Sequence, residues 1–229
     1  MMPTVDANHD RWVQRLTAAA RSGEILDLTA GVSDPDMLDP AHADTWPNER
    51  RVPAAAIRTT LLNAELDPDP HGLRLQGAHI TGALDLEHVR VPCPLWLTHC
   101  RIEDDADLTN GRLVELTLAH THSRNLVLVG AQITGSVFLT GLKATGEVRA
   151  LDAHLGGQLI LINAELTNEN GPALVLDGAQ ITGSVFLTGL KATGEVRALD
   201  AHLGGQLSLV EAELTNENGL IADEGVFGV

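Results

Sequence analysis

The feature that most constrains the fold is an unchanged internal repetition. The thirty residues at 130–159 occur again at 178–207, and residues 130–177 match residues 178–225 at 39 of 48 positions. A close-packed globular core does not accept a copied piece of its interior, because each core side chain has partners fixed by the whole fold. A solenoid accepts it, because each coil contacts only its neighbours. The repetition therefore predicts a repeat architecture.

A shorter period lies inside each copy. Apolar or small residues recur two positions apart, as in Leu73/Leu75 and Leu95/Leu97, and such pairs follow one another at steps of five or six residues. A spacing of two places both side chains on one face of a strand, whereas a helix returns at three and four. Four steps make about 22 residues, which we interpret as one coil with four short strands.

Stacked coils of this length align the apolar residues in four columns. One column contains only leucine: Leu75, Leu97, Leu118, Leu139, Leu161, Leu187 and Leu209. A second contains Ile80, Ile102, Ser123, Ala144, Leu166, Ala192 and Leu214. Aromatic residues make up only 3% of the chain, so the core must be built from aliphatic side chains. The columns predict an all-β solenoid, a four-sided parallel β-helix of about six coils.

The corners of the coil carry a recurring Thr-Gly pair. It stands where the step is six residues, at Thr81-Gly82, Thr134-Gly135, Thr145-Gly146, Thr182-Gly183 and Thr193-Gly194. We expect these glycines to adopt positive φ at sharp corners. The segment at 166–171 adds four residues to one corner, so that 48 residues make two coils plus four.

Residues 1–70 lack this rhythm. The pattern predicts helices over residues 10–21 and 52–62, with an Asp- and Pro-rich loop between them. The first coil of a β-helix leaves backbone groups unpaired, so we expect this segment to cap that end. The side chains expected to face the coil are Ile57, Leu61 and Leu62.

The small-x-Leu pattern resembles the pentapeptide-repeat family. The best matches are Gly77-Ala78-His79-Ile80-Thr81 and Asp105-Ala106-Asp107-Leu108-Thr109, and the resemblance covers residues 72–216. It implies a right-handed quadrilateral β-helix. The alternation of five and six departs from the family's steps of five. It is similar to that of bacterial repeat proteins often labelled "membrane-associated oxidoreductase". The chain shows no Gly-rich strand-to-helix fingerprint that would support the label.

The chain divides into three parts on this interpretation. Residues 1–70 form a helical N-terminal cap segment, residues 71–219 form the right-handed β-helix, and residues 220–229 form a C-terminal tail. No apolar run approaches the roughly 20 residues of a membrane span, and no signal peptide is visible at the N-terminus. Cys93 and Cys100 form no metal-type pair. We therefore expect a cytoplasmic protein without cofactor.

Net charge and individual polar residues give only weak evidence for a functional site. The chain has 15 Lys and Arg against 31 Asp and Glu, a net charge of -16, which argues against direct binding to nucleic acid or anionic lipid. His79, His154 and His202 each precede a core residue, so we expect them to point into solvent, and we predict no metal site. Asp85 and Asp107 stack on one side but have no basic partner evident in the sequence.

The outward positions on the all-leucine side form a more informative row. They are Arg74, Trp96, Thr117, Phe138, Ile160, Phe186 and Ser208. Trp96, Phe138, Ile160 and Phe186 would make an apolar stripe on the exterior, which is typical of a contact surface. The alternative is that the N-terminal segment folds along the stripe and covers it.

Three classes of function are compatible with these features. The first is a non-catalytic scaffold or protein-interaction module with an unknown protein partner. The second is an acidic DNA mimic that binds a DNA-handling enzyme such as a type II topoisomerase, which the pentapeptide-repeat resemblance implies. The third is an oxidoreductase-labelled or carbohydrate-active β-helix enzyme, for which no catalytic constellation is visible.

The last coil predicts self-association. Ala222-Asp223-Glu224 stands in the second copy where the first has Leu174-Val175-Leu176, and an acid at a core position cannot continue the coil. An open strand edge would then lie above Leu209 and Leu214, and uncovered edges pair. We expect a homodimer joined end to end through the C-terminal coils, as the resemblance also implies. The alternative is a truncated piece of a longer solenoid.

Overall fold

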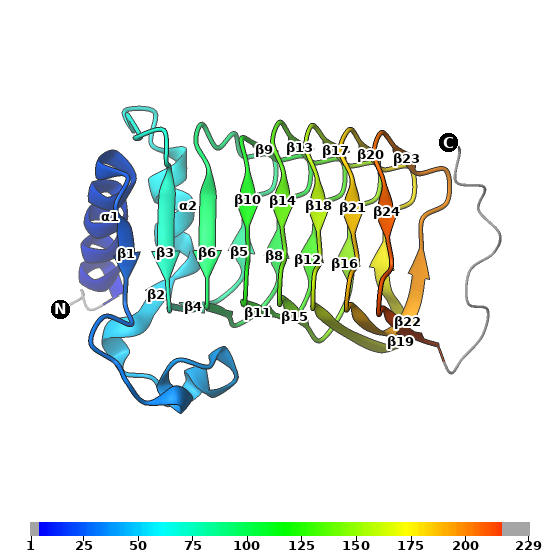
Figure 1. Ribbon diagram of the computed structural model, residues 1–229. Helices are drawn as coiled ribbons and strands as arrows, with labels where there is room; N and C mark the ends of the chain where they lie inside the picture. The colour runs from blue at the N-terminus through cyan, green and yellow to red at the C-terminus, as the bar shows by residue number, and fades with distance from the viewer. Residues whose placement is uncertain (1–4, 217–229) are drawn as a thin grey trace.

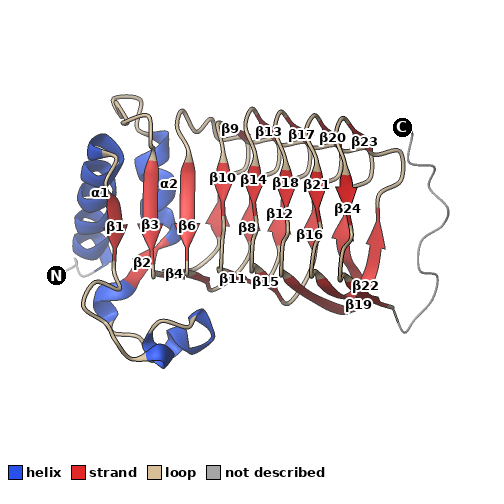
Figure 2. Cartoon of the chain, in the orientation of Figure 1, coloured by secondary structure: helices blue, strands red, loops and turns tan. Residues whose placement is uncertain are grey.

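The computed structural model describes residues 5–216. They form a rod of stacked coils with a helix across its N-terminal end (Figure 1). The strands run across the rod, their three sheets extend along it, and loops turn the corners (Figure 2). All strand pairs are parallel, and the coil makes about six turns, so the predicted four-sided β-helix is confirmed.

Each coil has four sides, which we number in chain order. The first side contains β1 (Ile25–Asp27), β3 (Leu73–Gln76), β6 (Leu95–Thr98), β10 (Leu116–Thr117), β14 (Val137–Phe138), β18 (Leu159–Ile160), β21 (Val185–Phe186) and β24 (Leu207–Ser208). The fourth side contains β9 (Arg112–Leu113), β13 (Gln132–Ile133), β17 (His154–Leu155), β20 (Gln180–Ile181) and β23 (His202–Leu203).

The second and third sides join into one sheet, because two long strands continue round the corner between them. The second side contains β2 (Arg51–Pro53), β4 (His79–Thr81), β7 (Arg101–Ile102), β11 (His122–Ser123), β15 (Lys143–Ala144) and β25 (Glu213–Thr215). The third contains β5 (Leu84–Asp85), β8 (Ala106–Asp107), β12 (Leu126–Val127) and β16 (Val148–Arg149). The strands β19 (Glu165–Val175) and β22 (Lys191–Arg197) belong to both. The four extra residues of 166–171 therefore lie inside a strand.

The core follows the predicted columns. Six of the seven residues in the leucine column are buried, and Leu209, in the last described coil, is 45% exposed. The register pairs Leu75 with Leu97 on the first side and Ala144 with Leu166 on the second, as the column alignment requires. Leu166 is fully buried between the smaller Ala144 and Ala192, so a large side chain fills the space that its small neighbours leave.

The predicted role of the Thr-Gly pairs is wrong at most corners. Gly82 and Gly194 do have positive φ, but Gly135, Gly146 and Gly183 do not. The left-handed residues gather instead at the corners that join the first side to the second and the third side to the fourth. They are Gly77, His99, His120, Gly141, Asn163, Gly189 and Glu211 at the one, and His88, Asn110, Gly130, Asp152, Gly178 and Asp200 at the other.

The N-terminal segment contributes strands as well as helices. Helix α1 is Val5–Ser22, longer than predicted, and α2 is Ala54–Leu62, with Pro53 at its N-cap. Ile57 and Leu61 are buried as expected, but Leu62 is 53% exposed. Strands β1 and β2 pair with β3 and β4, so the segment continues two sides of the solenoid, which the sequence did not indicate.

Three short 3₁₀ helices connect β1 to β2. They are η1 (Pro35–Met37), η2 (Pro40–Thr45) and η3 (Asn48–Arg50). Asp34 and Asp39 cap the first two by accepting hydrogen bonds from backbone N–H groups, at 3.1 Å and 2.9 Å. The segment expected to be a loop is therefore ordered by local capping.

Candidate functional site: an apolar ladder on the first side

The outward residues of the first side form one continuous ladder. Backbone pairing aligns Arg74 with Trp96, Trp96 with Thr117, Thr117 with Phe138, Phe138 with Ile160, Ile160 with Phe186 and Phe186 with Ser208. Ile25 of β1 adds a rung before Arg74. We call Trp96, Phe138, Ile160 and Phe186 the apolar ladder. The backbone pairing holds its rungs at about 4.8 Å, so it runs for about 20 Å along the rod.

The apolar ladder is half-buried rather than fully exposed. Trp96 donates its indole N–H to Glu115 Oε1 at 2.8 Å, and the Arg74 guanidinium lies 5.6 Å from its ring centre. Thr117, the small rung between Trp96 and Phe138, is only 8% exposed. The large side chains therefore shelter the small rung between them, and the polar partners of Trp96 fix its orientation.

The N-terminal segment folds along a different side. Helix η2 packs on β4 and β7 of the second side, away from the apolar ladder. It buries His79, which is 1% exposed and whose Nδ1 donates to the Ala43 carbonyl at 3.1 Å. The prediction that His79 points into solvent is therefore wrong, because a segment distant in sequence covers it. Burial lowers the pKa of His79.

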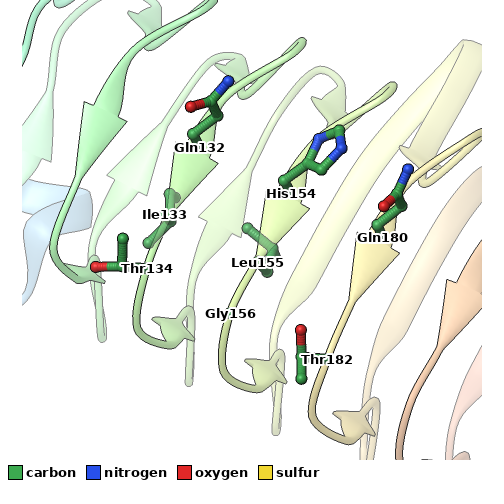
Figure 3. Close-up of a pocket in the computed structure, with 8 residues that line it drawn as sticks. All are labelled: Gln132, Ile133, Thr134, His154, Leu155, Gly156, Gln180 and Thr182. Carbon is green, nitrogen blue, oxygen red and sulfur yellow. The ribbon is translucent and has the colours of Figure 1, made fainter.

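The fourth side carries a shallow polar hollow. Figure 3 shows Gln132, His154 and Gln180 pointing outward from consecutive strands, and the hollow along them has a volume of about 430 Å³. His154 Nδ1 donates to the Asp152 carbonyl at 3.0 Å, and both His154 and His202 are exposed as predicted. The row offers hydrogen-bonding groups but no carboxylate, so it lacks an acid–base pair for catalysis.

Other histidines and the cysteines do not converge on a metal. His99 stacks on His120 with 4.9 Å between ring centres, while His122 is 9% exposed on a neighbouring strand. Among residues 5–216, no three His, Cys, Asp or Glu side chains come together as a metal site. Burial raises the pKa of the Cys100 thiol to about 12 and also raises that of Cys93, which opposes nucleophilic chemistry at either cysteine.

Two acidic side chains on or beside the third side, Asp85 and Asp105, contact arginines. Asp85 and Asp107 stand on adjacent rungs as predicted, and Arg58 of α2 donates to Asp85 Oδ1 at 2.9 Å. No pattern in the sequence indicates this partner. Asp105 accepts two hydrogen bonds from Arg124, at 2.8 Å and 3.0 Å, and these hydrogen bonds lower its pKa.

The described C-terminal end exposes core positions. Leu209 is 45% exposed and Leu214 is partly buried, while neighbouring Val210 is 60% exposed. Strands β23 and β24 are each the last strand of their sheets within the described chain. Ala222, Asp223 and Glu224, on which the prediction of an interrupted coil rests, lie outside the described residues.

Comparisons with known proteins add no relative. No family model, no curated protein and no solved structure matches the chain. In the part of the chain that the structure describes, no helix is long and apolar enough to cross a membrane. The fold is that of a β-helix repeat protein.

Proposed function

We propose that this protein is a non-catalytic scaffold that binds a protein partner through the apolar ladder. The observation that carries the proposal is the unbroken backbone pairing beneath the four large side chains. Large apolar side chains on a surface that is already ordered bind at a low entropic cost. Aromatic anchors of this kind are enriched at interface centres. We also propose a distant relation to pentapeptide-repeat proteins, which the four-sided coil supports.

The DNA-mimic alternative has less support. Mimicry of a phosphate backbone needs rows of unpaired acids, but acids on the rod pair with bases: Glu165 with Lys143 at 3.0 Å, and Asp177 with Arg197 at 2.7 Å. Such pairing cancels the local negative charge that mimicry would need. An enzymatic role has less support still, since Asp85 pairs with Arg58. Two buried free cysteines agree with the cytoplasmic location that we propose.

Loss of a partner after substitution on the ladder tests the scaffold proposal. Photocrosslinkable side chains at Thr140 and Thr188, beside the ladder on the first side, would trap a bound protein in the source cell. We expect Phe138→Asp and Phe186→Asp to abolish the crosslink, because each places a charge in the contact. The matched controls are Gln132→Asp and Gln180→Asp on the fourth side, which should preserve it. Equal crosslinking by all four variants contradicts the proposal.

We further propose that two copies join end to end through their C-terminal coils. The exposed Leu209 and Val210 and the last strands of the sheets support this arrangement. At the other end, α1 packs on β1, β2 and β3, so a copy cannot add there without displacing the helix (Figure 1). Association would then close at a dimer, because α1 covers the N-terminal end of each copy.

Light scattering tests this dimer directly. We expect the wild-type mass to rise towards twice the monomer mass with concentration, and Leu209→Glu with Val210→Glu to stay monomeric, since both charges would lie in the joint. The control is Leu62→Glu, an equally exposed leucine at the other end of the rod. Wild-type protein that stays monomeric at high concentration, also after removal of residues 220–229, excludes the dimer.

A further inference from the structure

An arginine-lined hollow lies in the N-terminal cap, away from the apolar ladder. It has a volume of about 510 Å³ and is lined by Arg11, Arg15, Asp27, Leu28, Glu49 and Arg50. Arg11 and Arg15 stand one helical turn apart on α1, so their side chains share one face. Arg50 ends η3 and adds a third guanidinium to the lining. Three cations and two carboxylates thus line one hollow of a protein whose net charge is -16.

These three arginines differ from the paired bases of the solenoid. Arg58, Arg124, Lys143 and Arg197 each contact a carboxylate within 4.0 Å. Among the described residues, none lies that close to Arg11, Arg15 or Arg50, although Asp27 and Glu49 line the same hollow. The Asp27 carboxylate is already engaged, since its Oδ1 accepts from the backbone N–H and the hydroxyl of Thr29 at 2.8 Å and 2.6 Å.

Two tryptophans hold the guanidinium groups in place. Arg15 lies 4.2 Å from the ring centre of Trp12, and Arg50 lies 3.4 Å from that of Trp46. Both rings are almost fully buried. Cation–π contacts of this kind orient an arginine without neutralising it. Both guanidinium charges are therefore positioned in advance. Arg15 is partly exposed to the hollow, whereas Arg50 is almost fully buried.

Arg50 supplies a second sign of a missing ligand. It is 3% exposed, and its Nε and Nη1 donate to the carbonyls of Gly77 and Met37. Its Nη2 has no hydrogen-bond partner among the described residues. A buried donor without an acceptor is costly, so an acceptor that reached this nitrogen would bind favourably. The nitrogen has almost no exposed surface, so the Arg50 side chain must shift before a ligand contacts it.

We propose that this hollow binds the phosphate group of a small molecule. A guanidinium presents a planar fork of donors that matches phosphate oxygens. With Asp27 and Glu49 counted, the lining has a net charge of +1, which favours an anion. Glu49 at the rim accepts a hydrogen bond from a hydroxyl on the rest of the ligand. The ligand class is a small phosphate monoester, with free inorganic phosphate as the other source of the same group.

Calorimetry on the full chain tests the phosphate site. The probes are inorganic phosphate, glycerol phosphate and acetate in a chloride buffer of low ionic strength. Arg15→Gln should weaken phosphate binding about 10- to 100-fold, the loss expected for one charge-assisted hydrogen bond. Glu49→Gln should strengthen it, because it removes a repelling charge. Arg112→Gln, an exposed arginine on the fourth side, should leave it unchanged.

Each outcome decides the proposal. Binding of glycerol phosphate above inorganic phosphate identifies an ester, whereas equal binding identifies free phosphate. Absence of binding at about 10 mM of either probe overturns the site. So does acetate binding as tightly as phosphate, or an equal loss in the Arg15 and Arg112 variants. Circular dichroism of every variant separates loss of binding from loss of fold. None of these results depends on the apolar ladder.

Discussion

Glycine serves two separate purposes at the corners of this coil. At Gly141, φ is +62°, a conformation that glycine adopts without steric cost. At Gly156, φ is not positive, but an added Cβ would lie 2.2 Å from the Thr134 carbonyl oxygen of the preceding coil. The sequence shows glycine in both places and does not distinguish them, because close approach depends on how adjacent coils stack.

Close approach at Gly156 leads to a stability prediction. Gly156→Ala should lower the free energy of unfolding by about 1–3 kcal/mol, because the methyl group meets backbone that cannot move without breaking a rung. Gly171→Ala is the matched control, since the nearest atom there is the flexible Asn168 side chain at 3.2 Å. Urea unfolding of the two variants measures the difference. Equal stability would mean that the coils have room to separate.

At the scale of elements, the 3₁₀ segment between β1 and β2 is the part that sequence patterns describe least well. Its capped turns depend on local sequence and can be predicted. Its position over the second side cannot, because a segment without periodicity carries no signal for the surface on which it packs. The periodic strands are predictable. The repeat spacing predicts the correct positions of all seven outward residues on the first side. The exposure of those residues still needed the structure.

Two histidines beneath and beside this segment predict a pH effect. Burial lowers the pKa of His79 and His122 from the ordinary value of 6.5. Around His79, Arg51 lowers the pKa further, and Glu103 and Asp44 raise it. Around His122, Asp39 and Glu165 raise it, and Lys143 and Arg101 lower it. The net shift in pKa is downward for both histidines. The unfolded chain therefore binds protons at a higher pH than the folded chain.

Stability should therefore be complete above about pH 6.5 and decline as the pH falls below that value. Urea unfolding between pH 7.5 and pH 5 measures the slope, in a range where carboxylates, with ordinary pKa values near 4, contribute little. His79→Gln keeps a donor for Ala43 and should reduce the slope. His154→Gln, at an exposed histidine, should not. An unchanged slope in the His79 variant would contradict the assignment.

At the scale of the whole molecule, the repeat explains why the sequence predicts most of the fold and little of the function. Every coil repeats one local rule, so a single period determines the columns, the register and the number of sides. The N-terminal hollow and the segment that covers His79 do not belong to the repeat. They arise where non-repeating chain meets the first coils, and partners such as Arg58 for Asp85 come together only in three dimensions.

Equivalence of the two copies is visible in the backbone. Gly130 and Gly178 occupy the same corner, with φ of +61° and +63°. Strand β13 pairs with β9, and β20 would occupy the place of β13 if the residues between them were removed. Because residues 178–207 are identical to residues 130–159, the new contact with β9 would use the same side chains.

Deletion of residues 130–177 should therefore give a folded, soluble protein that is shorter by two coils. Its urea m-value should fall by roughly a fifth, in proportion to the surface removed. Deletion of residues 131–140 alone removes about half a coil, so core leucines would face corners and the parallel pairing would fail. We expect that variant to be insoluble. Solubility, circular dichroism and urea unfolding compare the two, and equal behaviour would contradict the register on which the four columns depend.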